Sequence, residues 1–244
     1  VWHLRIEAIK LAFADALAHT ADPRRMQINP QKFLEEAYIA GRRKLIGNRA
    51  LSPPPGRPLD GGTVYLAAAD AEGNMVSYIQ SNFWGFGSGM VVPGTGIALH
   101  SRGLCFSLDP EHPNCLTPGM RPYHTIIPGF LSKNGRPLAA FGVMGAYLQP
   151  QGHVMVLSNM LDYGLNPQAA LDAPRFRWEE GLRVDVEAGF PASAAEALRR
   201  MGHDARCGAV GDRGFGRGQI IWRNEDGVLV CGSEPRCDGQ AAAW

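Results

Sequence analysis

A proline- and glycine-rich segment, residues 51–62 (LSPPPGRPLDGG), separates two parts of the chain with different hydrophobic periods. It holds four prolines and three glycines in 12 residues. Such a segment cannot form a helix or a central strand, because proline lacks a backbone donor and glycine loses more entropy when ordered. We therefore expect an exposed linker here, with mainly helical sequence before it and mainly strand sequence after it.

Before the linker, residues 2–19 carry apolar side chains at spacings of 3, 4 and 4 on one helical face, namely Ile6, Ile9, Phe13 and Leu17. The Asp22-Pro23 step ends this helix, because the residue before a proline is driven out of the α region. Residues 30–45 predict a second helix with basic residues in its last turns. The chain begins inside the first helical pattern without Met, so we expect it to be the latter part of a longer polypeptide.

After the linker, strand alternation at residues 63–69 and 75–80 flanks the turn 70–74, which predicts a β-hairpin. Residues 84–96 are punctuated by glycine and predict turns with short strands. Further strands are expected at 126–127, 138–141, 218–222 and 228–231, and helices at 152–161, 167–173 and 192–201. Helices that precede and interrupt mainly antiparallel strands are typical of a layered α+β sandwich.

Composition excludes several classes of function. The net charge is +1, which gives no electrostatic reason to expect nucleic acid or an anionic membrane as partner. No apolar run reaches the ~18 residues of a membrane span. The five cysteines form no CxxC pair, and His100, His112, His153 and His203 show no ligand spacing, so we expect no disulfide framework, metal or other cofactor. The cysteine usage favours a reducing, cytoplasmic compartment.

The junction of linker and first strand, Gly62-Thr63, is the strongest candidate for chemistry. Glycine permits backbone geometries that let the following hydroxyl attack the preceding carbonyl. Cleavage there would give Thr63 a free α-amine with a pKa of ~7.7–8.0, able to take the proton of its own hydroxyl. A threonine at a strand start is also ordinary, so the residues alone leave a structural role open.

Four blocks of sequence together resemble the γ-glutamyltransferase family of N-terminal-nucleophile hydrolases. They are WHLRIEAIKLAFADALAHTADP at the start, TVYLAAADAEGNMVSYIQSNFWGFGSG from Thr63, DYGLNPQAALDAPRFRW at 162–178 and EPRCDGQAAAW at the end. The resemblance spans nearly the whole chain. It implies a four-layer αββα sandwich and a precursor that cleaves itself at Gly62-Thr63. Residues 1–62 would then be the tail of a large subunit, and residues 63–244 the small catalytic subunit.

The resemblance assigns catalytic roles to four residues, two of which differ in type from the family's residue at that position. Thr63 takes the place of the nucleophile, and Ser81 that of a threonine whose hydroxyl contacts it. Gly145 and Ala146 stand where paired glycines supply the oxyanion hole; an alanine N–H can still donate if its backbone conformation is allowed. Without the resemblance, Gly145-Ala146 would be interpreted as a plain tight turn after a strand.

The substrate-binding positions depart from the family pattern. Arg102 and Cys105 stand where the family places groups that bind the α-ammonium of a glutamyl substrate, and His124 and Thr125 replace a serine pair for its α-carboxylate. A guanidinium repels an ammonium and favours an anion. This pattern resembles the oxamate amidohydrolase and cephalosporin acylase subgroup. The alternatives are a solvated or ion-paired surface role for Arg102 and a structural role for His124 at a strand start.

We therefore predict an amidohydrolase or acylase that cleaves a linear, carboxylate-bearing amide through a threonyl ester. Its partners would be a small-molecule amide and the remainder of the large subunit, with a homodimer of such heterodimers as one allowed assembly. Two alternatives stay open: an authentic γ-glutamyl hydrolase or transpeptidase, and a non-catalytic pseudoenzyme or interaction fragment.

Overall fold

The computed structural model describes residues 1–52, 62–209 and 213–244, so most of the expected linker lies outside the described residues. The chain divides into two compact units, and each draws on several stretches of sequence. Unit 1 is formed by Val1–Pro58, Ser101–His124 and Trp178–Gly208, and unit 2 by Leu59–His100, Thr125–Arg177 and Ala209–Trp244. Two later stretches of sequence therefore fold with the N-terminal helices in unit 1.

Unit 1 is built around helix α1, Trp2–His19. Ile6, Ile9 and Phe13 are buried as their spacing predicted, and Leu17 is half-buried. Helix α5 (Ala192–Arg200) and strands β6 (Arg183–Val186) and β7 (Asp204–Cys207) belong to the same unit. Strands β6 and β7 pair in parallel, and β5 (Phe176–Glu180) completes their sheet. This parallel pair is absent from the mainly antiparallel arrangement that the sequence predicts.

The predicted helix over 30–45 is wrong as a continuous element. The structure has a 3₁₀ helix η1 (Pro30–Leu34), an extended residue at Glu35, and then helix α2 (Glu36–Arg43). The Phe33 ring stacks on His19 and packs edge-on to Tyr38. These ring contacts accompany the break, so tertiary packing overrides a weak helical preference here.

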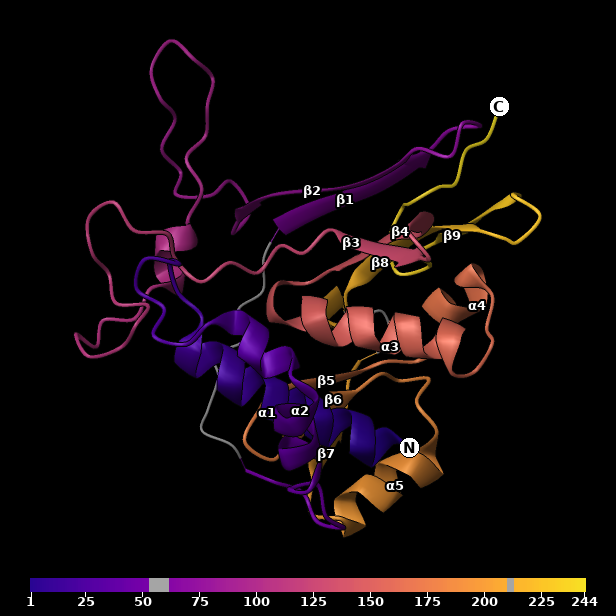
Figure 1. Cartoon of the computed structure of the whole chain (residues 1–244), viewed down its shortest axis with the longest axis horizontal. Helices are drawn as coiled ribbons and strands as arrows, with labels where there is room; N and C mark the ends of the chain where they lie inside the picture. Colours follow the sequence, from indigo (N-terminus) through magenta and orange to yellow (C-terminus); the bar gives the residue numbers. More distant parts are fainter. Residues whose placement is uncertain (53–61, 210–212) are drawn as a thin grey trace. The chain divides into compact units, whose positions relative to one another are not determined.

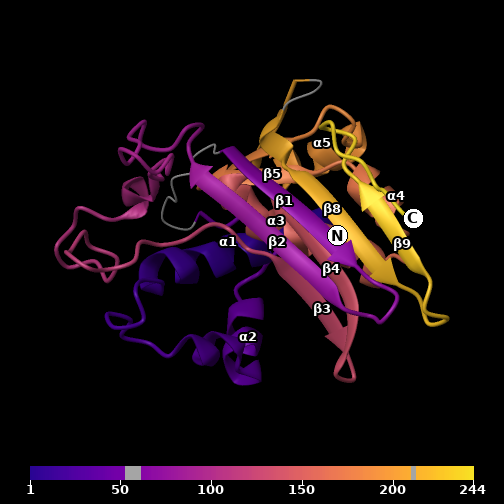
Figure 2. The ribbon, with the colours of Figure 1, turned by 90° about the horizontal axis from the view of Figure 1, so that it is seen from above.

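Unit 2 stacks a hairpin, a sheet and two helices (Figures 1 and 2). Strands β1 (Gly62–Ala69) and β2 (Met75–Phe83) form the predicted hairpin. The four-stranded sheet has the order β3-β4-β8-β9, with bounds Gly129–Lys133, Arg136–Met144, Arg217–Arg223 and Leu229–Ser233. Helices α3 (Gln149–Leu161) and α4 (Pro167–Asp172) pack on one face of this sheet, and β1 and β2 contact β4.

The core of unit 2 lies between the helices and the sheet. Its buried members are Phe141, Val143, Val156, Met160, Ala170, Leu171 and Ile220. At the chain's end, the buried Glu234 accepts hydrogen bonds from the Arg175 guanidinium and from the Gly218 N–H, each at 2.7 Å. Charged hydrogen bonds of this kind are stronger than neutral ones, so they hold the C-terminal block against β8.

Two short strand predictions in this unit are wrong. Residues 126–127 are not in a strand, and β3 begins only at Gly129. Residues 84–96 form turns, with an isolated bridge from Val91 to Ala98 in place of short strands. Both segments are too short or too rich in glycine to sustain a ladder. Within the described residues, no helix is long and apolar enough to cross a bilayer.

Candidate active site

Thr63 lies at the start of β1, directly opposite Ser81 of β2 in the hairpin register. Its Oγ1 donates a hydrogen bond to Ser81 Oγ at 3.1 Å. Ser81 Oγ also accepts the Phe83 N–H at 2.9 Å, which fixes the serine hydroxyl. Because cross-strand partners on one face of a sheet lie side by side, the register itself brings these two hydroxyl groups together. The structure thus joins the pair that the sequence predicts as nucleophile and orienting residue.

Gly145 and Ala146 form the turn after β4, and Ala146 also begins the 3₁₀ helix η3 (Ala146–Leu148), which leads into α3. Gly145 has φ 142° and Ala146 has φ 49°. A side chain makes the left-handed region costly, so a non-glycine residue persists there only when its surroundings hold it. Within the part of the chain that the structure describes, neither the Gly145 N–H nor the Ala146 N–H donates to a protein acceptor. The turn therefore presents two adjacent amide donors, as an oxyanion hole requires.

The strand carrying Thr63 packs against the strand that leads into this turn. Tyr65, two residues after Thr63, lies so close over Gly142 of β4 that a Cβ there would come within 2.5 Å of its ring. The Tyr65 hydroxyl is hydrogen bonded to Ser77 Oγ at 2.8 Å, and burial raises the pKa of Tyr65 to about 12. A neutral tyrosine thus fills the contact between β1 and β4 within unit 2.

Arg102 and Cys105 begin and end the 3₁₀ helix η2 (Arg102–Cys105) in unit 1. Both side chains are buried, Arg102 with an exposed fraction of 2%. The surface role considered for Arg102 is therefore wrong. Burial lowers the pKa of Arg102, while the charge of Cys105 acts in the opposite direction. Burial, together with Cys105, raises the pKa of Tyr123 to about 12, so the three side chains share one electrostatic environment.

His124 and Thr125 lie in the irregular segment before β3. His124 is exposed and Thr125 is buried. Because this segment is irregular, His124 does not begin a strand. The strand start assumed in the structural alternative for His124 is therefore wrong. His124 ends a stretch of unit 1, and Thr125 begins a stretch of unit 2.

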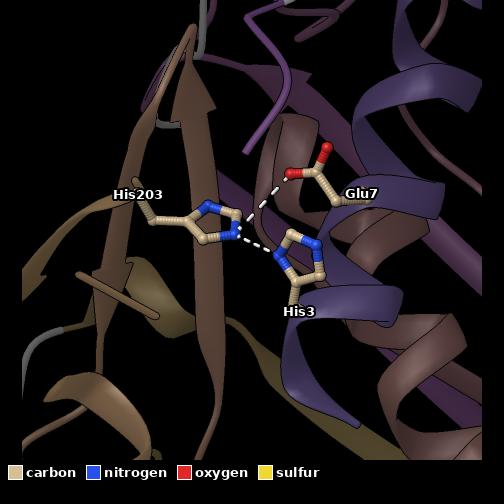
Figure 3. Close-up of side chains that lie close together, drawn as sticks. All are labelled: His3, Glu7 and His203. Atoms are coloured by element: carbon tan, nitrogen blue, oxygen red, sulfur yellow. Dashed lines mark hydrogen bonds and ion pairs between the residues drawn. The ribbon is translucent and has the colours of Figure 1, made fainter. Parts of the chain in front are cut away.

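A second polar cluster, which the sequence did not reveal, lies in unit 1 (Figure 3). His3 and Glu7 are one turn apart on α1, and His203 lies just before β7; one ligand-type atom from each falls within 4.8 Å of the others. His3 Nδ1 and His203 Nε2 are hydrogen bonded at 2.8 Å, and His3 Nε2 contacts the Gly47 carbonyl at 2.9 Å. All three side chains are buried.

Lys10 supplies the cation of this cluster. Its Nζ lies 2.9 Å from Glu7 Oε1 and 3.3 Å from His203 Nδ1. An ammonium can only donate and a carbonyl can only accept, so each ring donates through Nε2 along one directed chain that ends at Gly47. Burial, with Lys10 and His3 nearby, lowers the pKa of His203 to about 3, which keeps this ring neutral. Hydrogen bonds satisfy the ring nitrogens without a metal, and we assign the cluster a structural role.

The buried ion pair predicts a large stability effect. Lys10→Met keeps the side-chain volume but leaves the Glu7 carboxylate buried without a counter-charge. Breaking such a pair costs about 3–5 kcal/mol of the free energy of unfolding, to be measured by urea denaturation of the complete protein. The matched control is Arg206→Met, which removes the exposed pair with Asp204 and should cost about 0–1 kcal/mol. Equal losses in the two variants would contradict the assigned role.

The fold and the hydroxyl pair define a class of structure: a layered α+β fold with a candidate hydroxyl nucleophile at the start of a strand. The sequence model of the γ-glutamyltranspeptidase family matches residues 1–244. The chain therefore belongs to the γ-glutamyltranspeptidase family. Its fold is that of the family's N-terminal-nucleophile hydrolases, as the sequence predicted, and the chain holds part of it.

Two curated relatives are named as proenzymes of hydrolases. The chain is 37% identical to a glutathione hydrolase-like YwrD proenzyme of Bacillus subtilis, over 98% of this chain and 46% of that protein. It is 33% identical to an oxamate amidohydrolase proenzyme of Klebsiella pneumoniae, over 99% of this chain and 47% of that protein. It thus spans about half the length of the curated relatives it matches.

A solved structure, the cephalosporin acylase from Bacillus halodurans, shares 56% identity and a TM-score of 0.93 over 100% of this chain and 45% of that one. A γ-glutamyltranspeptidase chain from Pseudomonas nitroreducens shares 25% identity and a TM-score of 0.66. That alignment covers 74% of this chain and 98% of the Pseudomonas chain.

Proposed function

We propose that this chain is the catalytic part of a self-processing amidohydrolase that cleaves linear, carboxylate-bearing amides through an ester on Thr63. The observation that carries the proposal is the Thr63–Ser81 hydroxyl pair at the start of β1. The names of the matched relatives, amidohydrolase and acylase among them, support the reaction class. Their description as proenzymes supports a maturation step.

Self-processing begins with the Thr63 hydroxyl. Its Oγ1 attacks the Gly62 carbonyl carbon, and the proton of this hydroxyl passes to the peptide nitrogen as the C–N bond breaks. The resulting ester is hydrolysed by water, which leaves a carboxylate on Gly62 and a free α-amine on Thr63. Residues 63–244 would then form the small subunit. They make up about three quarters of the chain, close to the share that the Pseudomonas chain covers.

Turnover uses the same hydroxyl and the new amine. The α-amine takes the proton from Oγ1 as the oxygen attacks the substrate carbonyl, and the Gly145 and Ala146 N–H groups bind the oxyanion. The proton passes to the leaving amine when the C–N bond breaks, which gives the acyl-threonine. Water then gives a proton to the α-amine and attacks the ester carbon. As the bond to Oγ1 breaks, that proton passes to Oγ1, which releases the acid and restores the threonine hydroxyl. An acceptor amine in place of water would give transfer.

The large-subunit remainder is the proposed partner, and the hairpin supports it. One face of β1 and β2 carries the apolar side chains Val64, Leu66, Val76 and Tyr78, all exposed in this chain. Leu66 and Tyr78 are direct cross-strand partners, so these side chains form one continuous face. A contiguous apolar sheet face is typical of a surface that another layer covers.

Two alternative functions differ from this proposal in what they require of the chain. An authentic γ-glutamyl hydrolase would need other groups for its substrate's ammonium, because Arg102 and Cys105 occupy the family's positions for it. A non-catalytic fragment would retain the fold without cleavage at Gly62-Thr63. The buried Arg102 favours an acyl group with a carboxylate and no α-amine, since an ammonium beside a guanidinium suffers both desolvation and like-charge repulsion.

The substrate prediction separates the two enzyme candidates. Glutaryl or oxamyl amides should exceed γ-glutamyl amides in kcat/KM by about tenfold, which corresponds to about 1.4 kcal/mol of transition-state binding. The double variant Arg102→Gln with Cys105→Asp should shift the preference towards the γ-glutamyl donor, because it replaces a cation with a carboxylate. A carboxylate at position 105 alone could pair with Arg102, so Cys105→Asp serves as the control. A parent enzyme that prefers γ-glutamyl anilide would refute this pocket assignment.

A further inference from the structure

The end of strand β4 loses one of its two neighbours before the oxyanion turn begins. Pairing with β3 ends at Phe141, which lies opposite Gly129, whereas pairing with β8 continues to Met144. The last residues of β4 therefore need another partner on the side that β3 has left. A buried backbone N–H without an acceptor costs about 1–3 kcal/mol.

His153 of α3 provides that acceptor. The Val143 N–H donates to His153 Nε2 at 2.9 Å, in a buried contact. The ring must then carry its proton on Nδ1, and burial lowers the pKa of His153 to about 4, so the acceptor form is the stable one at neutral pH. Helix and strand are in direct contact here, because a Cβ at the neighbouring Gly152 would lie 2.6 Å from Val143 Cγ1.

The 3₁₀ helix η3 (Ala146–Leu148) and the first residue of α3 fix the far side of the turn. The Leu148 N–H donates to the Gly145 carbonyl at 2.8 Å. Gln149, the first residue of α3, accepts the Ile127 N–H through Oε1 at 3.0 Å. The left-handed Ala146 thus lies between two attachments, one through Val143 upstream and one through the start of α3 downstream. Such attachments are what a strained conformation needs in order to persist.

We infer that His153 is the positioning residue of the oxyanion turn, an inference that rests on the proposed function of Gly145 and Ala146. It acts on the reaction through Val143. Without the acceptor, the Val143 N–H is buried and unpaired, the end of β4 moves to reach another partner, and the two donors leave the oxyanion position. The loss falls on the transition state, because the donors bind the oxyanion more strongly than the ground-state carbonyl.

The test compares two substitutions in the processed, complete enzyme. His153→Met keeps an unbranched side chain of similar length without a good acceptor, whereas the amide oxygen of His153→Gln can reach the place of Nε2. We expect His153→Met to lower kcat by about 10- to 100-fold, with KM changed by less than about threefold. His153→Gln should restore kcat to within about threefold of the parent.

Val156→Ala is the matched control, because Val156 lies on the same helix and is buried in the same core but offers no polar contact to β4. It should lower the melting temperature with kcat unchanged. A kcat loss in Val156→Ala as large as in His153→Met, or full kcat in His153→Met, would overturn the inference. An Ala146→Pro enzyme that keeps the parent's kcat would instead refute the oxyanion role of the Ala146 N–H, so the two failures are distinguishable.

Discussion

Thr63→Ala is expected to give a single uncut chain without amidase activity, whereas the parent protein gives two chains that remain associated. The substitution removes the hydroxyl that attacks Gly62 and later the substrate. Because the same atom serves both steps, maturation and turnover should be lost together. The intact mass of the purified protein reports the first loss, and amide hydrolysis reports the second.

Thr63→Ser is the matched control, since it keeps the hydroxyl group and the opposition to Ser81 in the hairpin register. It should still cleave itself and retain measurable turnover. A parent protein that stays uncut yet hydrolyses amides at full rate would disprove the N-terminal nucleophile. A parent that is neither cut nor active would support the non-catalytic alternative.

The elements that sequence predicted well are those with local signals. The helix over 2–19 and the hairpin from Thr63 have clear periods and clear ends, so the chain's own pattern suffices to place them. The turn after β1 is similarly local, because Asp70 accepts hydrogen bonds from Asn74 and Gly73 adopts φ 90°. The opposition of Thr63 and Ser81 follows from this turn, since its length sets the register.

The features that sequence missed depend on residues far apart in the chain. His203 was considered only for metal spacing, yet it meets His3 and Lys10 across almost the whole chain length. The parallel pairing of β6 and β7 has no hairpin signal, because helix α5 separates the two strands. His153 lies within a helix that the sequence does predict, but its acceptor role depends on where β3 stops.

Ala146→Pro is expected to lower kcat by about 100- to 1000-fold, the usual cost of losing one oxyanion donor. Proline has no N–H, and its ring holds φ near −65°, whereas Ala146 has φ 49°. The substitution therefore removes a donor and also displaces the turn. Ala146→Gly is the matched control, because it retains the N–H and adopts a positive φ without strain.

To separate turnover from maturation, both variants should be produced already divided, with the part ending at Gly62 and the part beginning at Thr63 expressed as separate chains. Ala146→Gly should then keep kcat within about threefold of the parent, since the bound oxyanion loses nothing. The glycine variant also tests the strain directly. Its turn is less restricted, and a large loss in kcat would mean that the left-handed alanine contributes through its rigidity. An Ala146→Pro enzyme that folds and turns over as fast as the glycine variant would exclude the Ala146 N–H from the mechanism, because proline has no N–H with which to stabilise the oxyanion.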